Sequence, residues 1–280
     1  MTCLTLPPSS MSFDTIPSQA SLKPRPFTAH VSDKDLESFQ TLLKHSRIGP
    51  KTYENLTADV KDFTHFVLSL PGYGYSNGPP LDKDFDVQGI ARMVDILMVG
   101  LGFGGGYISQ GGDISSFVSR VLAVNAEACK AVHLHHAVPI KSLSQEEQKG
   151  LERYNNFNEI GNAYAREHGT RLSTIGLVLP SSPVALLAWV GEKFLQWSDT
   201  SPPLTELLVS VSLYWFTNSF PRAIYPYRQF FGSKPSFFHP DAEWHIKKPM
   251  GYSWHPKELA PVPKDWVAKS GNLVWYRGAL

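Results

Sequence analysis

Residues 107–116 have the sequence YISQGGDISS, and this stretch decides the fold. A short run that favours a β-strand stops at two glycines, an acidic residue and small residues follow, and residues 117–126 then show a helical pattern. This order is that of a nucleophile elbow, a strained strand-to-helix turn that exposes one reactive side chain above a parallel sheet. Gly111 and Ser115, two positions to either side of Asp113, are the small neighbours that such a crowded turn requires.

The reactive position of this elbow holds Asp113, where serine is the usual residue. A carboxylate nucleophile forms an ester with an alkyl carbon, so the expected substrate is an alkyl electrophile rather than an acyl one. The alternative interpretation is that Asp113 only caps the helix that follows it. The local pattern by itself favours neither interpretation.

Length and composition bound the class of protein. With 280 residues, of which 42% are hydrophobic, the chain can bury a substantial core, either as one α/β domain with an insertion or as nearly two domains. The 26 basic and 25 acidic residues balance, which argues against a nucleic-acid or anionic-membrane partner. Cys3 and Cys129 offer no disulfide framework, and we find no signal peptide or membrane-spanning stretch, so we expect a cytoplasmic protein.

The predicted elements alternate between strands and helices through the first half of the chain. An amphipathic helix begins at Ser32, and the apolar positions that follow predict a strand over 63–70, a helix over 87–101 and a strand over 131–138. This order is typical of a parallel α/β sheet. Residues 144–216 are helical in pattern and dense in aromatic residues, which predicts a helical cap inserted between strands of the sheet.

Two further motifs suggest other functions but fit them poorly. Residues 100–105 spell G-x-G-x-x-G, yet they follow a helix and precede a strand, the reverse of a dinucleotide-binding turn, so a glycine-rich helix exit is the favoured interpretation. His133 and His135 would share one face of a strand, with His136 beside them, but no acidic or cysteine partner lies at a matching spacing. We therefore expect neither a nucleotide nor a metal site.

Several segments together resemble the epoxide hydrolases of the microsomal type, a family of the α/β-hydrolase fold. Each segment is similar to one family motif: residues 69–76 (SLPGYGYS) to S-L-P-G-Y-G-F/Y-S, 110–114 (QGGDI) to Q-G-G-D-W, 182–194 (SPVALLAWVGEKF) to S-P-x-G-L-x-A-W-I-x-E-K-F, 214–217 (YWFT) to Y-W-x-T, and 255–259 (HPKEL) to F-P-x-E-L. These segments follow the family order and cover most of the chain. The resemblance favours the elbow interpretation of Asp113 over the capping one.

The resemblance implies a two-step mechanism and assigns its residues. Asp113 would attack an epoxide carbon while Tyr164 and Tyr227, with Tyr225 as the alternative second tyrosine, donate hydrogen bonds to the epoxide oxygen. A histidine oriented by Glu258 would then activate water to hydrolyse the ester, and the backbone N–H of Ile114 would supply half of the oxyanion hole. The implied substrates are a small lipophilic epoxide and water, the product is a vicinal diol, and no cofactor or metal is implied.

The sequence departs from the family pattern at two places. The family's H-G-W-P-G loop and early strands have no counterpart between Arg47 and Asp62, and the family's histidine segment, G-G-H-F-A, does not occur. We therefore expect an incomplete core, no catalytic histidine at the family position, and an epoxide hydrolase that is weak or inactive because ester hydrolysis stalls. The alternatives are a non-catalytic relative that binds an epoxide or a partner, a truncated gene product, and a haloalkane dehalogenase, which uses the same ester chemistry.

The predicted organisation has five parts: a disordered arm over 1–26, an epoxide-hydrolase N-terminal region over 27–60, a first α/β-hydrolase core segment over 61–138, a helical cap over 139–238 and a second core segment over 239–280. The fold class is thus α/β, an α/β-hydrolase sheet flanked by helices with an inserted cap. A homodimer is one assembly that we consider, and a role in detoxification or in secondary metabolism would each suit such an enzyme.

Overall fold

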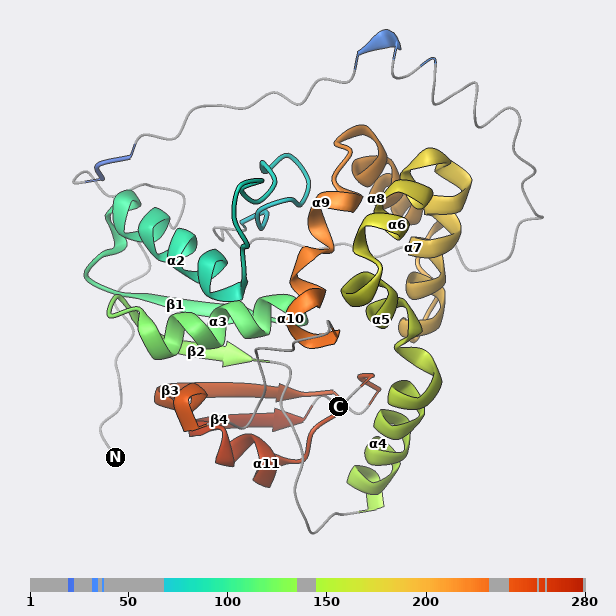
Figure 1. Cartoon of the computed structure of the whole chain (residues 1–280). Coiled ribbons are helices and arrows are strands. Elements are labelled where there is room, and N and C mark those ends of the chain that lie inside the picture. Colours follow the sequence, from blue (N-terminus) through green and yellow to red (C-terminus); the bar gives the residue numbers. More distant parts are fainter. Residues whose placement is uncertain are drawn as a thin grey trace.

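The computed structural model describes residues 20–22, 32–34, 37, 68–134, 145–231, 242–255, 257–259 and 261–278. These residues form a parallel sheet with helices packed on it and, beside the sheet, a bundle of helices (Figure 1). The predictions for the arm, for most of the helix that begins at Ser32, for the strand residues 63–67, and for His135 and His136 lie outside the described residues.

The sheet of the described residues has four parallel strands in the order β1-β2-β3-β4. Its strands are β1 (Tyr107–Gly111), β2 (Cys129–Leu134), β3 (Ile246–Trp254) and β4 (Gly271–Gly278). β1 and β2 are neighbours in sequence and in space, whereas the chain leaves the sheet after β2 and returns to it in β3. The predicted parallel α/β architecture with an insertion is therefore confirmed.

Helices α2 (Val87–Met98), α3 (Ile114–Asn125) and α11 (Lys264–Lys269) pack on one face of this sheet. Asp86 caps α2 by accepting a hydrogen bond from the N–H of Gly89 at 2.6 Å. A π-helical turn, Val99–Phe103, ends this helix, and Gly102 there has a φ of 94°, which a side chain would strain. The glycine-rich helix exit predicted for residues 100–105 is thus confirmed.

The other face of the sheet carries exposed apolar residues. Ile108 of β1 is 73% exposed and Trp275 of β4 is 46% exposed. Their neighbours along the strands, Tyr107 and Tyr276, point to the helix-covered face, where Tyr107 donates to Asp95 of α2 and Tyr276 lies under Lys264 of α11. Parallel sheets are normally covered on both faces, so this exposure agrees with a core that lacks part of the family's layers among the described residues.

Arg120 of α3 ties the helix layer to the second half of the sheet. This side chain is 1% exposed, and burial lowers its pKa to about 10. Its guanidinium donates to the carbonyl oxygens of Trp244 at 3.1 Å and Ser270 at 3.0 Å, just before β3 and β4, and to the Ser270 hydroxyl at 3.2 Å. An arginine buried among carbonyl oxygens therefore links segments that are more than 100 residues apart in sequence.

The cap is a bundle of helices with its own apolar core. Its helices are α4 (Gln145–Asn156), α5 (Ala163–Thr170), α6 (Leu172–Val178), α7 (Pro183–Trp197), α8 (Leu204–Phe216), α9 (Phe220–Ala223) and α10 (Arg228–Phe231), with a π turn over Phe157–Gly161 and 3₁₀ turns over Leu179–Ser181 and Tyr225–Tyr227. A further 3₁₀ turn, Ala242–Trp244, packs on α3 with the sheet core. Leu186, Leu207 and Phe220 are central to this second core. The sequence predicts helices from residue 144 to about 197 and from 204 to about 216, and this is confirmed for the described residues.

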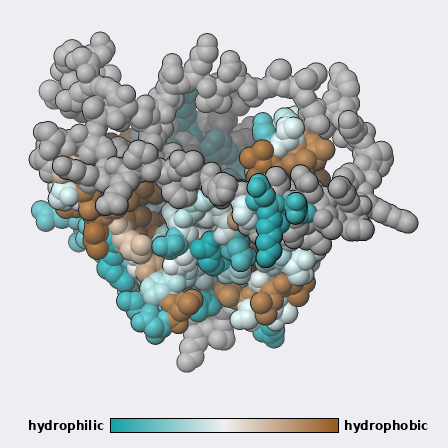
Figure 2. All heavy atoms as spheres, turned by 90° about the horizontal axis from the view of Figure 1, so that it is seen from above, coloured by the Kyte–Doolittle hydropathy of each residue, from teal (hydrophilic) through white to brown (hydrophobic). Residues whose placement is uncertain are grey.

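Apolar side chains also reach the outer surface of the cap. The exposed ones include Leu177 on α6, Leu195 on α7 and Val209 on α8. Figure 2 shows such hydrophobic surface as brown patches among hydrophilic residues. In the part of the chain that the structure describes, no single helix is long and apolar enough to cross a membrane, although one pair, Leu172–Ser181 with Pro183–Trp197, has the length and composition to do so and is bent by 114°.

Gly111 provides a test of the close packing between β1 and α3. A Cβ added at Gly111 would lie 2.2 Å from the carbonyl oxygen of Ser115, so Gly111→Ala must displace the helix and should lower the free energy of unfolding by about 3 kcal/mol. Gly105→Ala is the matched control, because no atom lies within 4 Å of its added Cβ, and it should change stability by less than about 0.5 kcal/mol. Urea unfolding followed by circular dichroism measures both, and equal stabilities would contradict the packing described here.

Candidate active site

Asp113 lies at a strained bend between β1 and α3. Its φ of 46° and ψ of −130° are unusual for a residue with a side chain, and the backbone there reverses from the strand into the helix. The Ser116 hydroxyl steadies the bend by donating to the carbonyl oxygen of Gly111 at 2.9 Å. Asp113 makes no side-chain capping bond to α3, so the capping interpretation is not what the structure shows.

Asp113 is exposed as a whole residue, but protein atoms lie around its carboxyl group and remove part of its hydration. Desolvation by this surrounding protein raises its pKa first of all, the negative charge of Glu258 raises it further, and one hydrogen bond from the backbone N–H of Ile114 opposes these effects. Burial and the charge of Glu258 therefore disfavour the charged form of this carboxyl group, and the hydrogen bond from Ile114 favours it. The same arrangement brings Glu258, from the segment after β3, into electrostatic reach of Asp113.

Four tyrosines lie within electrostatic reach of this carboxylate. The charge of Asp113 contributes to the raised pKa values of Tyr73, Tyr164, Tyr214 and Tyr227, each of which is raised mainly by burial. Tyr164 and Tyr227 belong to the set predicted from the sequence, whereas Tyr73 and Tyr214 do not. Both missed tyrosines lie in segments that resemble the family, residues 69–76 and 214–217, so the sequence did mark them. The sequence could not show which way their side chains point, because that depends on the fold.

Tyr164 and Tyr227 form a hydrogen-bonded pair. Their ring centroids are 6.0 Å apart in an edge-to-face arrangement. The hydrogen bond between the phenols lowers the pKa of Tyr164 and raises that of Tyr227, the pattern expected when Tyr227 donates and Tyr164 accepts.

Tyr225 lies elsewhere. It is 4% exposed, packs with the sheet core and contacts Phe85 at a ring distance of 6.0 Å. Burial raises its pKa, and its further electrostatic neighbours are Arg228 and Asp86 rather than Asp113. Its hydroxyl has no hydrogen-bond partner among the described residues. The 3₁₀ turn over Tyr225–Tyr227 thus places Tyr225 in the sheet core and Tyr227 at the cavity.

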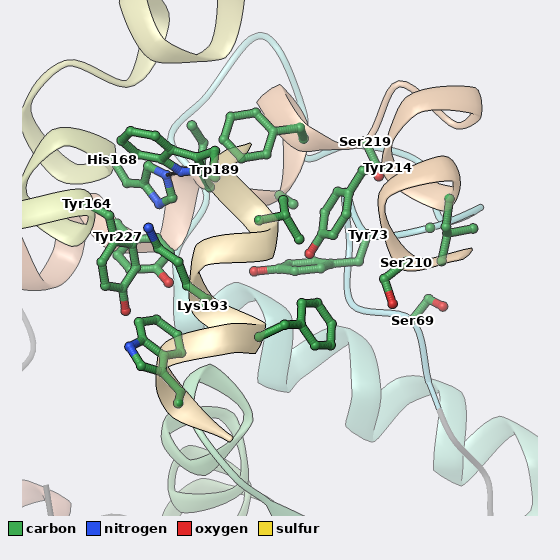
Figure 3. Close-up of a pocket in the computed structure, with 18 residues that line it drawn as sticks. Ser69, Tyr73, Tyr164, His168, Trp189, Lys193, Ser210, Tyr214, Ser219 and Tyr227 are labelled. Atoms are coloured by element: carbon green, nitrogen blue, oxygen red, sulfur yellow. Dashed lines mark hydrogen bonds between the residues drawn. The ribbon is translucent and has the colours of Figure 1, made fainter. Parts of the chain in front are cut away.

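A cavity of about 440 Å³ lies between the sheet and the cap beside these phenols. Figure 3 shows Tyr73 and Tyr214 on one side of it and Tyr164 and Tyr227 on the other. All four line the cavity, whereas Asp113 is not among its lining residues. The other lining side chains are mostly aromatic or aliphatic and include Trp189, Val190, Phe194, Trp197, Leu213, Phe220 and Ile224. The cavity therefore suits a small apolar molecule that carries one or two hydrogen-bond acceptors.

His168 and Trp189 form the end of the cavity on the cap side. The indole N–H of Trp189 donates to Nε2 of His168 at 3.1 Å, and because that N–H can only donate, the imidazole must carry its proton on Nδ1. Burial lowers the pKa of His168 to about 4, and the charge of Lys193 contributes to this lowering. Nδ1 is buried without a hydrogen-bond partner among the described residues. His168 is thus a neutral side chain at neutral pH.

His133, which the sequence marks as a possible metal ligand, lies away from this cavity. On β2 it is within hydrogen-bonding distance of the Ser253 hydroxyl, 3.1 Å from Nε2, and it contacts the Trp275 ring. Within the described ranges no three His, Cys, Asp or Glu side chains are grouped so as to hold a metal ion.

The chain is similar to several known epoxide hydrolases. The solved structure of the Aspergillus niger epoxide hydrolase is 39% identical, with 95% of this chain and 92% of that chain covered, and superposes with a TM-score of 0.81. A provisionally named epoxide hydrolase of Dothistroma septosporum is 34% identical, with 95% of this chain and 86% of the relative covered. The juvenile hormone epoxide hydrolase of Bombyx mori, at 23% identity and a TM-score of 0.59, covers 75% of this chain and 52% of that chain and shares the fold. No protein-family model matches the chain.

The alignment with the Dothistroma relative also shows internal gaps. It spans 369 positions, whereas this chain has 280 residues, so at least 89 aligned positions lack a residue in this chain. Because the alignment covers 95% of the chain, these gaps lie within the aligned span. That finding agrees with the expectation of missing internal segments; their location between Arg47 and Asp62 stays a prediction.

The burial of neutral His168 predicts a pH dependence of stability. The unfolded chain takes up a proton on this ring below its ordinary pKa of 6.5, whereas the folded protein does so only near pH 4, so this stability is complete above pH 6.5 and is lost as the pH falls toward 4. His168→Gln keeps an acceptor for Trp189 but does not titrate. Its melting temperature should therefore fall less than that of the wild type between pH 7 and pH 5.

His245→Gln is the control for this comparison, because His245 is exposed. It should keep the wild-type slope of melting temperature against pH in differential scanning calorimetry. If His168→Gln shows the same slope as the wild type, burial of a neutral imidazole is not the source of the effect.

Proposed function

The chain belongs to the epoxide hydrolases of the α/β-hydrolase fold, and from this premise we propose that it opens epoxides through an ester on Asp113. The observation that carries this proposal is a partly desolvated carboxylate at a strained elbow, within electrostatic reach of four phenols. Acyl-transfer hydrolases need donors for a carbonyl oxyanion, whereas epoxide opening needs a carboxylate nucleophile together with acids for the leaving oxygen. This site has both.

In the first step an Asp113 oxygen attacks an epoxide carbon and a C–O ester bond forms. The ring C–O bond breaks, its electron pair passes to the oxygen, and that oxygen takes a proton from Tyr164 while Tyr227 supports the phenol. The hydrogen bond between these tyrosines and the electrostatic reach of both to Asp113 support this assignment. General acid assistance of this kind contributes on the order of 10²- to 10⁴-fold.

In the second step water hydrolyses the ester and releases a vicinal diol. Attack on the ester carbonyl creates an oxyanion, and the backbone N–H of Ile114, which now bonds to the carboxylate, is suited to stabilise it. This step also needs a base. The cavity-lining histidine, His168, already accepts a hydrogen bond on Nε2 and carries its proton on Nδ1, so it is unsuited to that role. We therefore propose that ester formation is faster than ester hydrolysis in this chain. Glu258 is proposed to orient the base of the second step.

The proposed substrates are small lipophilic epoxides. A cavity of about 440 Å³ with a mostly apolar lining holds a molecule of the size of styrene oxide, and its few polar groups do not suit a strongly polar one. Water is the second substrate.

Asp113→Ala tests the nucleophile. Incubated with styrene oxide, the wild-type chain should gain the mass of one substrate molecule per chain, because the ester forms faster than it is hydrolysed. The Asp113→Ala chain should gain no mass. Asp95→Asn is the control, since Asp95 accepts a hydrogen bond from Tyr107 at the other end of β1. Intact-protein mass spectrometry measures the adduct, and an equal adduct in Asp113→Ala would remove Asp113 from the mechanism.

Substitutions of the tyrosines test the acids. Tyr164→Phe or Tyr227→Phe should slow adduct formation by about tenfold to a hundredfold, and the double variant should reduce it to the limit of detection, since one phenol can partly replace the other. Tyr225→Phe should react at the wild-type rate because Tyr225 lies in the sheet core. A double variant that still reacts at the wild-type rate would show that phenols do not assist ring opening.

A further inference from the structure

Helices α5 and α7 face each other across the cavity wall with two pairs of residues, each spaced by four. Tyr164 and His168 belong to α5, and Trp189 and Lys193 belong to α7. A spacing of four places both members of a pair on the same face of a helix. The sequence alone does not reveal that these two faces meet, because their contact depends on how the cap folds.

The four side chains close a ring of contacts. Trp189 donates its indole N–H to His168 at 3.1 Å, and His168 meets Tyr164 edge-to-face with centroids 5.5 Å apart. The Lys193 ammonium then completes the ring, since Nζ lies 4.8 Å from the centroid of Trp189 and 4.9 Å from that of Tyr164. Figure 3 shows Lys193 reaching toward Tyr164 from the α7 ribbon. Each contact is of the kind that fixes a long side chain in one orientation.

Lys193 brings a positive charge into an apolar wall. Its side chain is 15% exposed, and among the described residues that line the cavity it is the single lysine or arginine. Its ion-pair partner, Glu192, is 52% exposed and therefore screened by solvent, while His168 is neutral. The ammonium lies over the ring of Tyr164, and its charge also lowers the pKa of His168.

The cation lies over the ring of Tyr164, with Nζ 4.9 Å from the ring centroid. The hydrogen bond between the two phenols lowers the pKa of Tyr164 and raises that of Tyr227, which fits Tyr164 as the acceptor in the pair. The ring of His168 also contacts Tyr227, at a centroid distance of 4.8 Å, and that ring carries no charge. Of the two phenols, Tyr164 therefore has a positively charged neighbour over its ring, whereas Tyr227 contacts a neutral imidazole.

We propose, on the basis of the function proposed above, that Lys193 is a positioning residue for Tyr164 and strengthens it as the proton donor to the opening epoxide. When the ring C–O bond breaks, its electron pair stays on the oxygen, the Tyr164 proton moves to that oxygen, and negative charge develops on the phenol. The fixed ammonium over the ring lowers the energy of this charge. Water later returns the proton to Tyr164.

The test measures ester formation directly. Rapid mixing of the full chain with styrene oxide, quenching and intact-mass detection give the rate of adduct formation before any hydrolysis. Lys193→Met and Lys193→Gln remove the charge, and each should slow the adduct about tenfold; Lys193→Arg, which keeps the charge, should stay within about threefold of the wild type. Lys264→Met is the matched control, because Lys264 lies over the Tyr276 ring at 5.8 Å, in the sheet domain, and it should react as the wild type does.

A double-variant cycle with Tyr164→Phe separates positioning from a general loss of structure. If Lys193 acts through the Tyr164 hydroxyl, then Lys193→Met should slow adduct formation in the wild-type background and hardly at all in the Tyr164→Phe background. The Tyr227→Phe background should retain most of the Lys193 effect. An equal slowing in all backgrounds, or no slowing in the wild type, would overturn the proposal.

A binding measurement covers the case in which the wild type forms no adduct, which would count against the proposed function itself. Phenylacetamide has the size of styrene oxide and a carbonyl oxygen that accepts hydrogen bonds from phenols. Its affinity, measured by calorimetry, should fall several-fold in Lys193→Met and Lys193→Gln, with no further loss when Tyr164→Phe is already present. An affinity that does not depend on Lys193 would overturn the assignment of this residue whatever the adduct experiment shows.

Discussion

The bend at Asp113 is the constraint on which the rest of the site depends. A positive φ at a residue with a side chain is costly, and it persists here because Gly111 lets the strand and the helix approach until no Cβ would fit between them. At this bend the Asp113 side chain makes no N-cap hydrogen bond to α3. The surrounding protein then displaces much of the water from this group, and the four phenols become its neighbours.

In the proposed mechanism the cap contributes Tyr164 and Tyr227 as acids, and the turn between β1 and α3 contributes Asp113 as the nucleophile. The two layers depend on different contacts: the sheet side is fixed by α3, with Arg120 joining it to the segments before β3 and β4, and the cap side has its own apolar core around Leu186 and Phe220. A substrate between them is therefore exposed to a negative group from one layer and to phenols and an ammonium from the other. In the proposed mechanism the nucleophile and its acids therefore come from different parts of the chain: the phenols line the cavity, whereas Asp113 does not.

The local elements of the fold could be predicted from the sequence because each has a short-range signal. The glycine pair and small residues mark the elbow, apolar spacing marks α2, and Ser182 with Pro183 marks the start of α7. The roles of Tyr73, Tyr214 and Lys193 could not be predicted, since each depends on which way the cap folds over the sheet. Tyr225 and Tyr227 remained alternatives for the same reason: they are two positions apart, and only the 3₁₀ turn decides which one reaches the cavity.

A crystal structure of the chain soaked with styrene oxide is the most direct test of ester formation at Asp113. We expect continuous electron density between an Asp113 carboxylate oxygen and a carbon of the former epoxide, with the new hydroxyl group within hydrogen-bonding distance of Tyr164 and the left-handed bend unchanged. Density for the ligand on another side chain, or an Asp113 that has turned back to cap α3, would contradict this mechanism.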